Sequence, residues 1–502
     1  MPGTGEDASE MSPHSEDPES AVSVHPEAPQ PRIMRLGGVI NNSAALILLD
    51  LLNKAIPLVV FPWVVRALGP AVYGQLGFAT AVAGFFGLLA SPGFTTYALR
   101  EAAKDDDRVS FLAQHVLGAR LVFAAAAFML LLVFAAFFAP REGEIRVLIL
   151  LSGLAFVLPS IDTQWIFAAR SRMWIIAGRG ALSQLVYATL ILSLVHRAHD
   201  AWIVPAAGLV SSGLTTLLLW ISARHEYHIP LPRISPQTWG VFLGVCLIMG
   251  FSSLMSLIYD QIDTVMLKYF RPDTELGLYV ASYSLMSMSM SFLPILGQVF
   301  LPLLSETAGQ NSDSQKRYLR WLAHATVGLA MPAAVGGYLL AFPITQFVLG
   351  GQYSGAGTLF RWLMLTLLTG SLASYFGAQL IPNGRERRYL VSVVAGAVTN
   401  VVLNLLLIPR YGAIAAALTT AFSQGIVAVS NYYFVRDLRT PGIWGAVALS
   451  VPATCLMAAL IATAKAVYPI HVVALVILGA VFYLVAYALT IMVRRRILAT
   501  GH

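Results

Sequence analysis

The 502-residue chain is 57% hydrophobic and only 11% charged, whereas a soluble domain is typically about 25% charged. Its mean hydropathy of +0.72 indicates a protein that crosses a membrane many times. The net charge of +7 comes from basic residues scattered between apolar runs, which argues against a nucleic-acid-binding face. Cys246 and Cys455 lie in separate apolar segments and provide neither a disulfide framework nor a metal site.

Residues 1–31 contain seven acidic residues and no lysine or arginine. This composition, which is also rich in proline and serine, predicts a disordered tail. We extend the tail to residue 37 and place it in the cytoplasm. The basic start and short apolar core of a cleaved signal peptide are not visible, so we expect the first membrane span to direct insertion.

Apolar stretches of the length needed to cross a bilayer follow the tail. A transmembrane helix needs roughly 20 mostly apolar residues, and the sequence offers fourteen such stretches separated by short polar breaks. They lie near residues 40–66, 74–98, 112–139, 146–169, 173–196, 201–223, 238–269, 275–305, 320–349, 357–381, 388–408, 412–435, 442–465 and 470–493. The predicted fold class is an all-α integral membrane protein of about 14 helices.

Lysine and arginine are distributed unevenly between alternate loops. With the N-terminus in the cytoplasm, the inner loops hold 20 of these residues and the outer loops hold 8. Because cytoplasmic loops carry the excess of basic residues, we expect both termini to be cytoplasmic.

A weak internal repeat relates the two halves of the chain. Gly74 in Tyr-Gly-Gln-Leu corresponds to Gly277 in Leu-Gly-Leu-Tyr, and Gly178 corresponds to Gly396. These offsets predict two parallel six-helix lobes around a central cavity, as in transporters whose halves are related by an axis along the membrane normal. We place the lobes at 38–224 and 225–440, followed by two further helices and a short cytoplasmic C-terminus in 441–502.

The segment 383–412, NGRERRYLVSVVAGAVTNVVLNLLLIPRYG, carries a combination of features that resembles a known family. It has a basic loop (Arg385, Arg387 and Arg388), two asparagines (Asn400 and Asn404) and an Ile-Pro-Arg-Tyr-Gly turn before an alanine-rich helix start. Leu68-Gly69-Pro70 with Tyr73-Gly74, and Asp260-Gln-Ile-Asp263 with Gly277-Leu-Tyr279, agree as well. Together these blocks resemble the polysaccharide transporter family, the Wzx-type lipid-linked oligosaccharide flippases of the multidrug/oligosaccharidyl-lipid/polysaccharide exporter superfamily.

The resemblance spans about residues 38–435. It implies fourteen helices in two bundles, alternating access, and movement of an undecaprenyl-diphosphate-linked oligosaccharide from the cytoplasmic to the outer leaflet of a bacterial cytoplasmic membrane. The product would be a surface polysaccharide such as O-antigen, capsule or exopolysaccharide, with a polymerase and chain-length machinery as further partners. The sequence departs from the family at Ser91-Pro92-Gly93, where an acidic turn is usual, so a role tied to that acidic position does not transfer.

Three basic residues within predicted spans of the first half are candidates for binding the diphosphate: Lys54, Arg120 and Arg179. Cations there can meet phosphates through charge-assisted hydrogen bonds. The structural alternative is that Asp50 neutralises Lys54 four residues away while the two arginines reach back to the cytoplasmic surface. Asp162 is expected to pair with Arg120 or Arg179.

Asp260 and Asp263 lie one helical turn apart in a predicted span of the second half. Two close carboxylates at membrane depth could exchange a proton or hold Na⁺, so they are candidates for ion coupling or gating, together with Asp50 and Arg361. The alternative is a salt bridge from this pair to Lys268 or Arg361.

Carboxamides in the second half are candidates for a sugar path because they stay neutral and bind hydroxyl groups. They are Asn400, Asn404, Gln298 and Gln424, with Asn431 nearby. The alternative is that each holds neighbouring helices together by hydrogen bonds.

Two other functions compete with a flippase. A cation-coupled drug or metabolite exporter of the same superfamily would need neither the last two spans nor basic residues in its cavity. A membrane glycan polymerase or ligase should show a large outer loop, and every predicted outer loop is short. Metal-ligand spacing, a phosphate-binding glycine loop and a nucleophile elbow are not visible in the sequence, so we expect a protein that is not an enzyme and has no cofactor beyond a coupling H⁺ or Na⁺.

Overall fold

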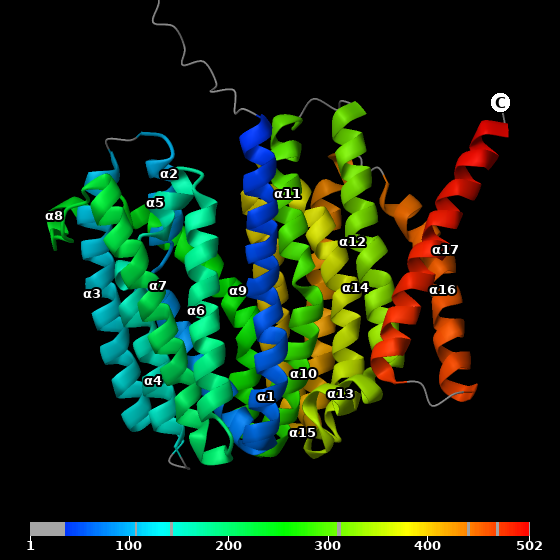
Figure 1. Cartoon of the computed structure of the whole chain (residues 1–502), viewed down its shortest axis with the longest axis horizontal. Helices are drawn as coiled ribbons and strands as arrows, with labels where there is room; N and C mark the ends of the chain where they lie inside the picture. The colour runs from blue at the N-terminus through cyan, green and yellow to red at the C-terminus, as the bar shows by residue number, and fades with distance from the viewer. Residues whose placement is uncertain are drawn as a thin grey trace, which may run out of the picture. The chain divides into compact units, whose positions relative to one another are not determined.

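The computed structural model describes residues 36–105, 108–140, 144–308, 313–438, 442–467 and 471–500, with the side chains at 36–52, 54, 156–158 and 494–500 left out of the description. All regular elements in these ranges are helices. The chain divides between Ala45 and Leu46, and all the packing described here lies within the second unit, Leu46–His502. Figure 1 shows the helices with their labels.

Within the described ranges, the first half of the chain forms seven α-helices joined by short connections. They are α1 (Leu36–Ala90), α2 (Phe94–Ala102), α3 (Arg108–Phe137), α4 (Ile145–Val157), α5 (Gln164–Ala169), α6 (Met173–Leu194) and α7 (Ile203–Tyr227), with single turns at η1 (Leu158–Ile161) and η2 (Ala198–Trp202). The fourth predicted span is therefore broken at η1, where Pro159 cannot donate a backbone hydrogen bond.

The described part of the second half forms ten α-helices. They are α8 (Pro236–Trp239), α9 (Leu243–Phe270), α10 (Asp273–Met290), α11 (Phe292–Glu306), α12 (Asp313–Leu339), α13 (Ala341–Leu349), α14 (Ala356–Leu380), α15 (Glu386–Val435), α16 (Ile443–Val467) and α17 (Val472–Thr500), with single turns at η3 (Gly351–Tyr353) and η4 (Arg436–Leu438).

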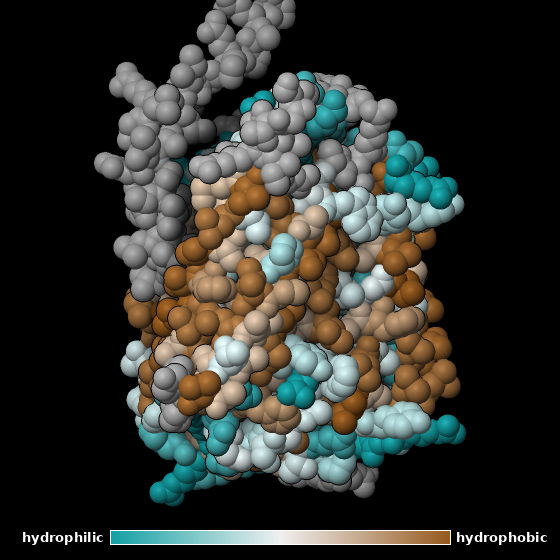
Figure 2. Space-filling model, turned by 90° about the vertical axis from the view of Figure 1, so that its right-hand side faces the viewer, coloured by the Kyte–Doolittle hydropathy of each residue, from teal (hydrophilic) through white to brown (hydrophobic). Residues whose placement is uncertain are grey.

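Helix length and composition confirm a multi-pass membrane protein. Among the described residues, 11 helical stretches are long and apolar enough to cross a membrane. Figure 2 shows a hydrophobic band across the face that carries α16 and α17, with hydrophilic residues above and below it. Side chains such as Trp444, Ile477 and Val481 are exposed on these helices, as expected for a surface covered by lipid. The count of fourteen spans stays a prediction.

Two of the long helices contain a break where the sequence predicts a boundary between spans. Gly69 in α1 has φ 72° and Gly412 in α15 has φ 61°, a region that favours glycine. A break leaves backbone groups without helical partners, and distant residues satisfy them. The Tyr353 hydroxyl donates to the Val65 carbonyl at 3.0 Å.

The break at Gly412 is held from both sides by the junction between α9 and α10. Arg271 Nε donates to the Ile408 carbonyl at 3.2 Å, and Glu275 Oε1 accepts from the Ala413 amide at 2.7 Å. Both parts of α15 are therefore fixed to α10 next to Gly412, where the chain changes direction.

Helices close in sequence pack mainly with one another. In the first half, α3 packs on α4 and α6 on α7, and in the second half α14 packs on α12 and α15, while α16 packs on α12 and α17. The halves meet where α2 approaches α9. Gly93 (φ 77°) is required there because a Cβ at this position would lie 2.6 Å from the Cys246 carbonyl oxygen.

Candidate functional site

A cavity of about 800 Å³ lies among α9, α10, α11, α14 and α15, and we call it the C-half cavity. Its lining brings together three residues predicted from the sequence, Asp260, Gln298 and Gln424, with Asn431 beside them. Its other polar lining groups are the Gln261 carboxamide and several hydroxyls, and none of the described lining residues is basic. The cavity therefore offers hydrogen bonds and a single carboxyl group inside an apolar bundle.

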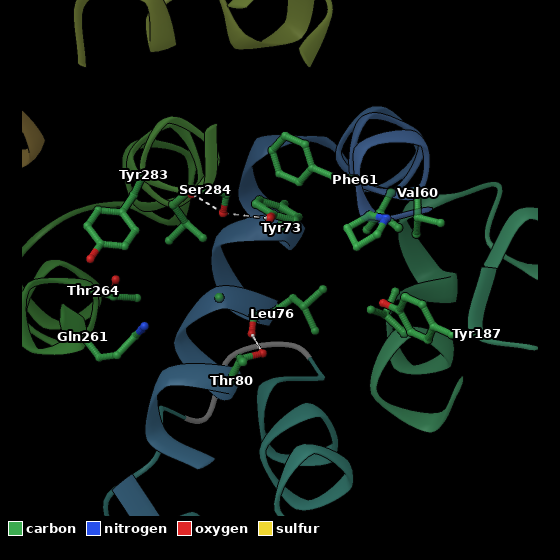
Figure 3. Close-up of a pocket in the computed structure, with 15 residues that line it drawn as sticks. Val60, Phe61, Tyr73, Leu76, Thr80, Tyr187, Gln261, Thr264, Tyr283 and Ser284 are labelled. Atoms are coloured by element: carbon green, nitrogen blue, oxygen red, sulfur yellow. Dashed lines mark hydrogen bonds between the residues drawn. The ribbon is translucent and has the colours of Figure 1, made fainter. Parts of the chain in front are cut away.

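A smaller pocket of about 310 Å³ lies between helices of the two halves, and we call it the inter-half pocket (Figure 3). Val60, Phe61 and Leu76 of α1 and Tyr187 of α6 face Gln261, Thr264 and Tyr283 of α9 and α10 across it. Gln261 and Tyr283 also line the C-half cavity. These two side chains therefore stand between the two spaces.

Asp263 is fully buried in a cluster of hydroxyl groups beside the C-half cavity. It accepts a short hydrogen bond from the Tyr279 hydroxyl, one from the Thr420 hydroxyl at 3.3 Å and one from the Thr264 amide at 2.7 Å. Asp260, one turn earlier, is exposed to the cavity instead. The two carboxyl groups thus have different surroundings, and Thr420 lies at the boundary because it lines the cavity as well.

The cations that the sequence offered as partners for these carboxyl groups are engaged with other groups. Lys268 pairs with Asp273 at 2.5 Å, and Asp273 also accepts from Gln75 at 2.7 Å. The Arg361 guanidinium lies over the rings of Tyr338 and Phe342, at 5.0 and 4.8 Å from their centres. Roles for Arg361 in gating stay predictions.

Arg120 and Arg179, the two arginines predicted to bind the diphosphate, are not among the described residues that line either cavity. Arg120 is 9% exposed, and its Nε has no hydrogen-bond partner in the described part of the chain. Asp162 is close enough to interact electrostatically with it, and the ion pair expected from the sequence stays a prediction. Arg179 donates a short hydrogen bond to Ser222 and lies 5.7 Å from the centre of the Phe167 ring. Predictions for Lys54 and Asp50 fall on side chains outside the described set.

Asn400 and Asn404 are fully buried within α15 and away from the C-half cavity lining. Asn404 donates to Asn400 Oδ1 at 2.9 Å and accepts a short hydrogen bond from Thr419 across the break at Gly412. This placement favours the packing role that the sequence left open, because these bonds join the two parts of α15.

Arg385 of the basic loop holds the start of α15 to its end. Its guanidinium donates to both Asp437 oxygens at 2.7 Å and to the Phe434 carbonyl at 2.6 Å. These bonds raise the pKa of Arg385. The first residue of the basic motif therefore has a structural role.

Sequence reasoning missed four residues that complete the site: Tyr279, Thr420, Gln261 and Tyr283. Tyr279 and Gln261 belong to the sequence blocks around Gly277 and Asp260, so their proximity to the aspartates along the chain was a usable signal. The sequence gives no such signal for Thr420 and Tyr283, because whether these side chains reach the site depends on how α15 and α10 are rotated about their axes.

Several membrane-spanning helices that enclose a polar cavity define the chain as a membrane transporter. A model of the family described as polysaccharide biosynthesis protein matches residues 39–308, and the chain belongs to that family.

Individual relatives agree with this assignment. The "Putative O-antigen transporter" of Escherichia coli (strain K12) is 21% identical over 77% of this chain and 94% of its own length. The "Probable low-salt glycan biosynthesis flippase Agl15" of Haloferax volcanii is 21% identical over 37% of this chain and 40% of its own. The solved structure of "Lipid II flippase MurJ, inward closed conformation" shares the fold, with a TM-score of 0.75 at 14% identity, covering 92% of this chain and 100% of that one.

Proposed function

We propose that this chain is a flippase that moves an undecaprenyl-diphosphate-linked oligosaccharide from the cytoplasmic to the outer leaflet of the bacterial cytoplasmic membrane. The observation that carries the proposal is the C-half cavity, a space of about 800 Å³ inside an apolar bundle whose lining includes one carboxyl group, several carboxamides and several hydroxyls. Relatives named as an O-antigen transporter and a glycan biosynthesis flippase support the choice of substrate. The oligosaccharide would then be used for a surface polysaccharide, by a polymerase and chain-length machinery.

Alternating access between two lobes, 38–224 and 225–440, is the proposed mechanism. The inter-half pocket gives it a basis, because its walls come from α1, α6 and α7 on one side and from α9 and α10 on the other. Relative movement of the lobes would change this space directly. Both termini are placed in the cytoplasm by the distribution of basic residues.

The polar substrate groups are assigned to different parts of the protein. Gln298 and Gln424 in the C-half cavity suit the hydroxyl groups of sugars, while Lys54, Arg120 and Arg179 of the first half are the proposed partners of the diphosphate. The buried Nε of Arg120, which has no partner in the described residues, supports a ligand there. Transport breaks no covalent bond, so the proposed function needs no catalytic group.

Asp263 is the proposed site for the coupling H⁺ or Na⁺. A buried carboxylate is unfavourable unless it is compensated, and the described hydrogen bonds of Asp263 come from two hydroxyls and an amide. A proton or a small cation would supply the missing positive charge.

Cells that lack the chromosomal gene and carry variants of this chain test the proposal. Arg120→Ala and Lys54→Ala should abolish surface glycan, because each removes a cation proposed to bind the diphosphate, whereas Arg120→Lys should retain part of it. Membrane levels of each variant, measured by immunoblot, control for misfolding. Normal surface glycan in both alanine variants would reject the diphosphate assignment, and normal glycan in cells without any copy of the gene would reject the function.

A further inference from the structure

We infer that the C-half cavity receives the sugar part of the substrate and selects glycans without acidic sugars, with Asp260 as the residue that rejects them. The inference rests on the proposed function. Asp260 is the one acidic residue among the described residues that line the cavity, and no basic residue stands among them. The chemistry of the lining, rather than its size alone, defines what can be held there.

The neutral groups of the cavity suit a hydroxyl-rich ligand. Its volume of about 800 Å³ falls within the range of about 300–1,000 Å³ typical of small-molecule sites. Within the described part of the chain, neither Gln298 nor Gln424 has a side-chain hydrogen-bond partner. Each carboxamide can both donate to and accept from a sugar hydroxyl, so these groups are free to bind one.

Asn431 is oriented by the protein and keeps an acceptor unused. Its Nδ2 donates to the Ala373 carbonyl at 3.1 Å, while its buried Oδ1 has no partner in the described residues. An oxygen held in place without a donor is suited to accept a hydrogen bond from a hydroxyl group.

An acidic sugar in this cavity would meet an uncompensated like charge. Two carboxylates in a low-dielectric space disfavour each other's ionised form, so the sugar would be repelled or Asp260 would first have to bind a proton. Because the described lining contains no lysine or arginine, nothing there offsets this cost. A neutral or amine-bearing sugar meets neither penalty, and the result is selection by an unfavourable contact.

Asp260 is distinct from the proposed coupling site although it lies one turn away. It faces the cavity, whereas Asp263 is fully buried. The two roles can therefore be separated by experiment.

Purified full-length protein in liposomes provides the test. The probes are two synthetic undecaprenyl-diphosphate disaccharides, one of neutral hexoses and one in which the distal hexose is the matching hexuronic acid. Flipping is measured by the accessibility of the sugar to an external label. Wild-type protein should flip the neutral compound at least about ten-fold faster than the acidic compound. Asp260→Asn should reduce this ratio of flipping rates to below about three-fold, because the acidic compound is flipped faster.

The matched control is Asp313→Asn, which removes a carboxylate whose side chain is 93% exposed and outside the cavity, and it should leave the wild-type ratio unchanged. Gln424→Lys, which adds a cation to the lining, should reverse the preference toward the acidic compound. This second variant decides the outcome if Asp260→Asn protein is inactive.

Equal wild-type rates for the two compounds would overturn the inference and leave the flippase assignment intact. An unchanged ratio in Asp260→Asn or, where that variant is inactive, in Gln424→Lys would overturn it too. Failure of wild-type protein to move either compound faster than protein-free liposomes would instead reject the proposed function.

Discussion

Asp260 and Asp263 are one turn apart on α9, yet only Asp263 is closed off from the C-half cavity. The difference follows from helix geometry, because three positions along a helix turn a side chain by about 60° relative to its neighbour above. Tyr279 and Thr420, from α10 and α15, cover Asp263 on that side. This difference in direction places the Asp260 carboxyl group in the cavity, where a substrate can contact it. The Asp263 carboxyl group is left in a buried position with room only for an ion.

Replacing Asp263 with asparagine tests the ion-coupling role at the scale of one residue. Asparagine keeps an oxygen acceptor for Tyr279 but cannot take up a proton or balance a cation, so flipping by Asp263→Asn should no longer change when a proton or sodium gradient is collapsed. Proteoliposomes with and without ionophores provide the measurement. Asp313→Asn, which alters an exposed pair with Lys316, should respond as wild type does. A wild-type rate and a wild-type gradient response in Asp263→Asn would show that coupling lies elsewhere.

At the scale of elements, α15 depends on residues of the junction between α9 and α10. Arg271 and Glu275 satisfy the carbonyl of Ile408 and the amide of Ala413 on the two sides of Gly412. They also approach each other, at 3.9 Å. This arrangement leaves no room beside Gly412, where an added Cβ would collide with the Glu275 carboxylate.

Alanine at Gly412 should therefore destabilise the protein more than the backbone angle alone explains. An L-residue at the φ of 61° and ψ of −141° of Gly412 costs of order 1–3 kcal/mol, and displacement of Glu275 adds to that cost. Gly384→Ala is the matched control, since Gly384 has φ 67° with no heavy atom within 4 Å of an added Cβ. Thermal unfolding of the purified variants in detergent should rank Gly412→Ala below Gly384→Ala. Equal melting temperatures would remove the steric part of the explanation.

The sequence predicts the helices well because long apolar runs have few alternatives in a bilayer. It predicts the breaks at Gly69 and Gly412 as boundaries between spans. It does not predict what holds the two breaks, since the stabilising partners Tyr353 and Glu275 are 288 and 138 residues away in the chain. Asp260, Gln298 and Gln424 could be predicted as polar residues in spans. The cover over Asp263 could not, because Thr420 is 157 residues away.

At the scale of the whole molecule, two glycines that correspond in the predicted internal repeat lie in contact. Gly74 and Gly277, which correspond in the repeat, are packed against each other: a Cβ on Gly74 would lie 2.7 Å from the Gly277 nitrogen, and one on Gly277 would collide with the Pro70 carbonyl. Equivalent positions meet in this way close to a two-fold axis, and small residues allow helix backbones to approach closely in membranes. The contact supports the proposed pair of lobes.

Gly277→Ala should keep the two halves apart at the contact with Gly74, because the added methyl group would collide with the Pro70 carbonyl. Overpacking costs about 1–3 kcal/mol, enough to shift a conformational equilibrium by roughly ten-fold, so flipping should slow by about that factor while the protein remains in the membrane. Ser284 contacts Tyr73 at 3.5 Å in the inter-half pocket. In a protein whose Cys246 and Cys455 are replaced by alanine, Ser284→Cys should react faster with an impermeant maleimide when Gly277→Ala is present than when it is absent.

Gly208→Ala serves as the control for this experiment, because an added Cβ there meets no heavy atom within 4 Å. It should leave both the flipping rate and the labelling rate at the wild-type values. Unchanged labelling and flipping in Gly277→Ala would mean that the two halves do not separate at this contact.

The glycine contact also has a thermodynamic consequence. Hydrophobic stabilisation scales with the apolar area removed from water and is absent between helices that leave lipid, and two glycines contribute almost no side-chain area at Gly74 and Gly277. Parting the helices here therefore exposes little apolar area, while a single methyl group prevents them from meeting. What resists separation at this contact is the hydrogen bond from Gln75 to Asp273 at 2.7 Å, so the two halves are joined here by a polar contact that can break and re-form and not by a buried apolar surface.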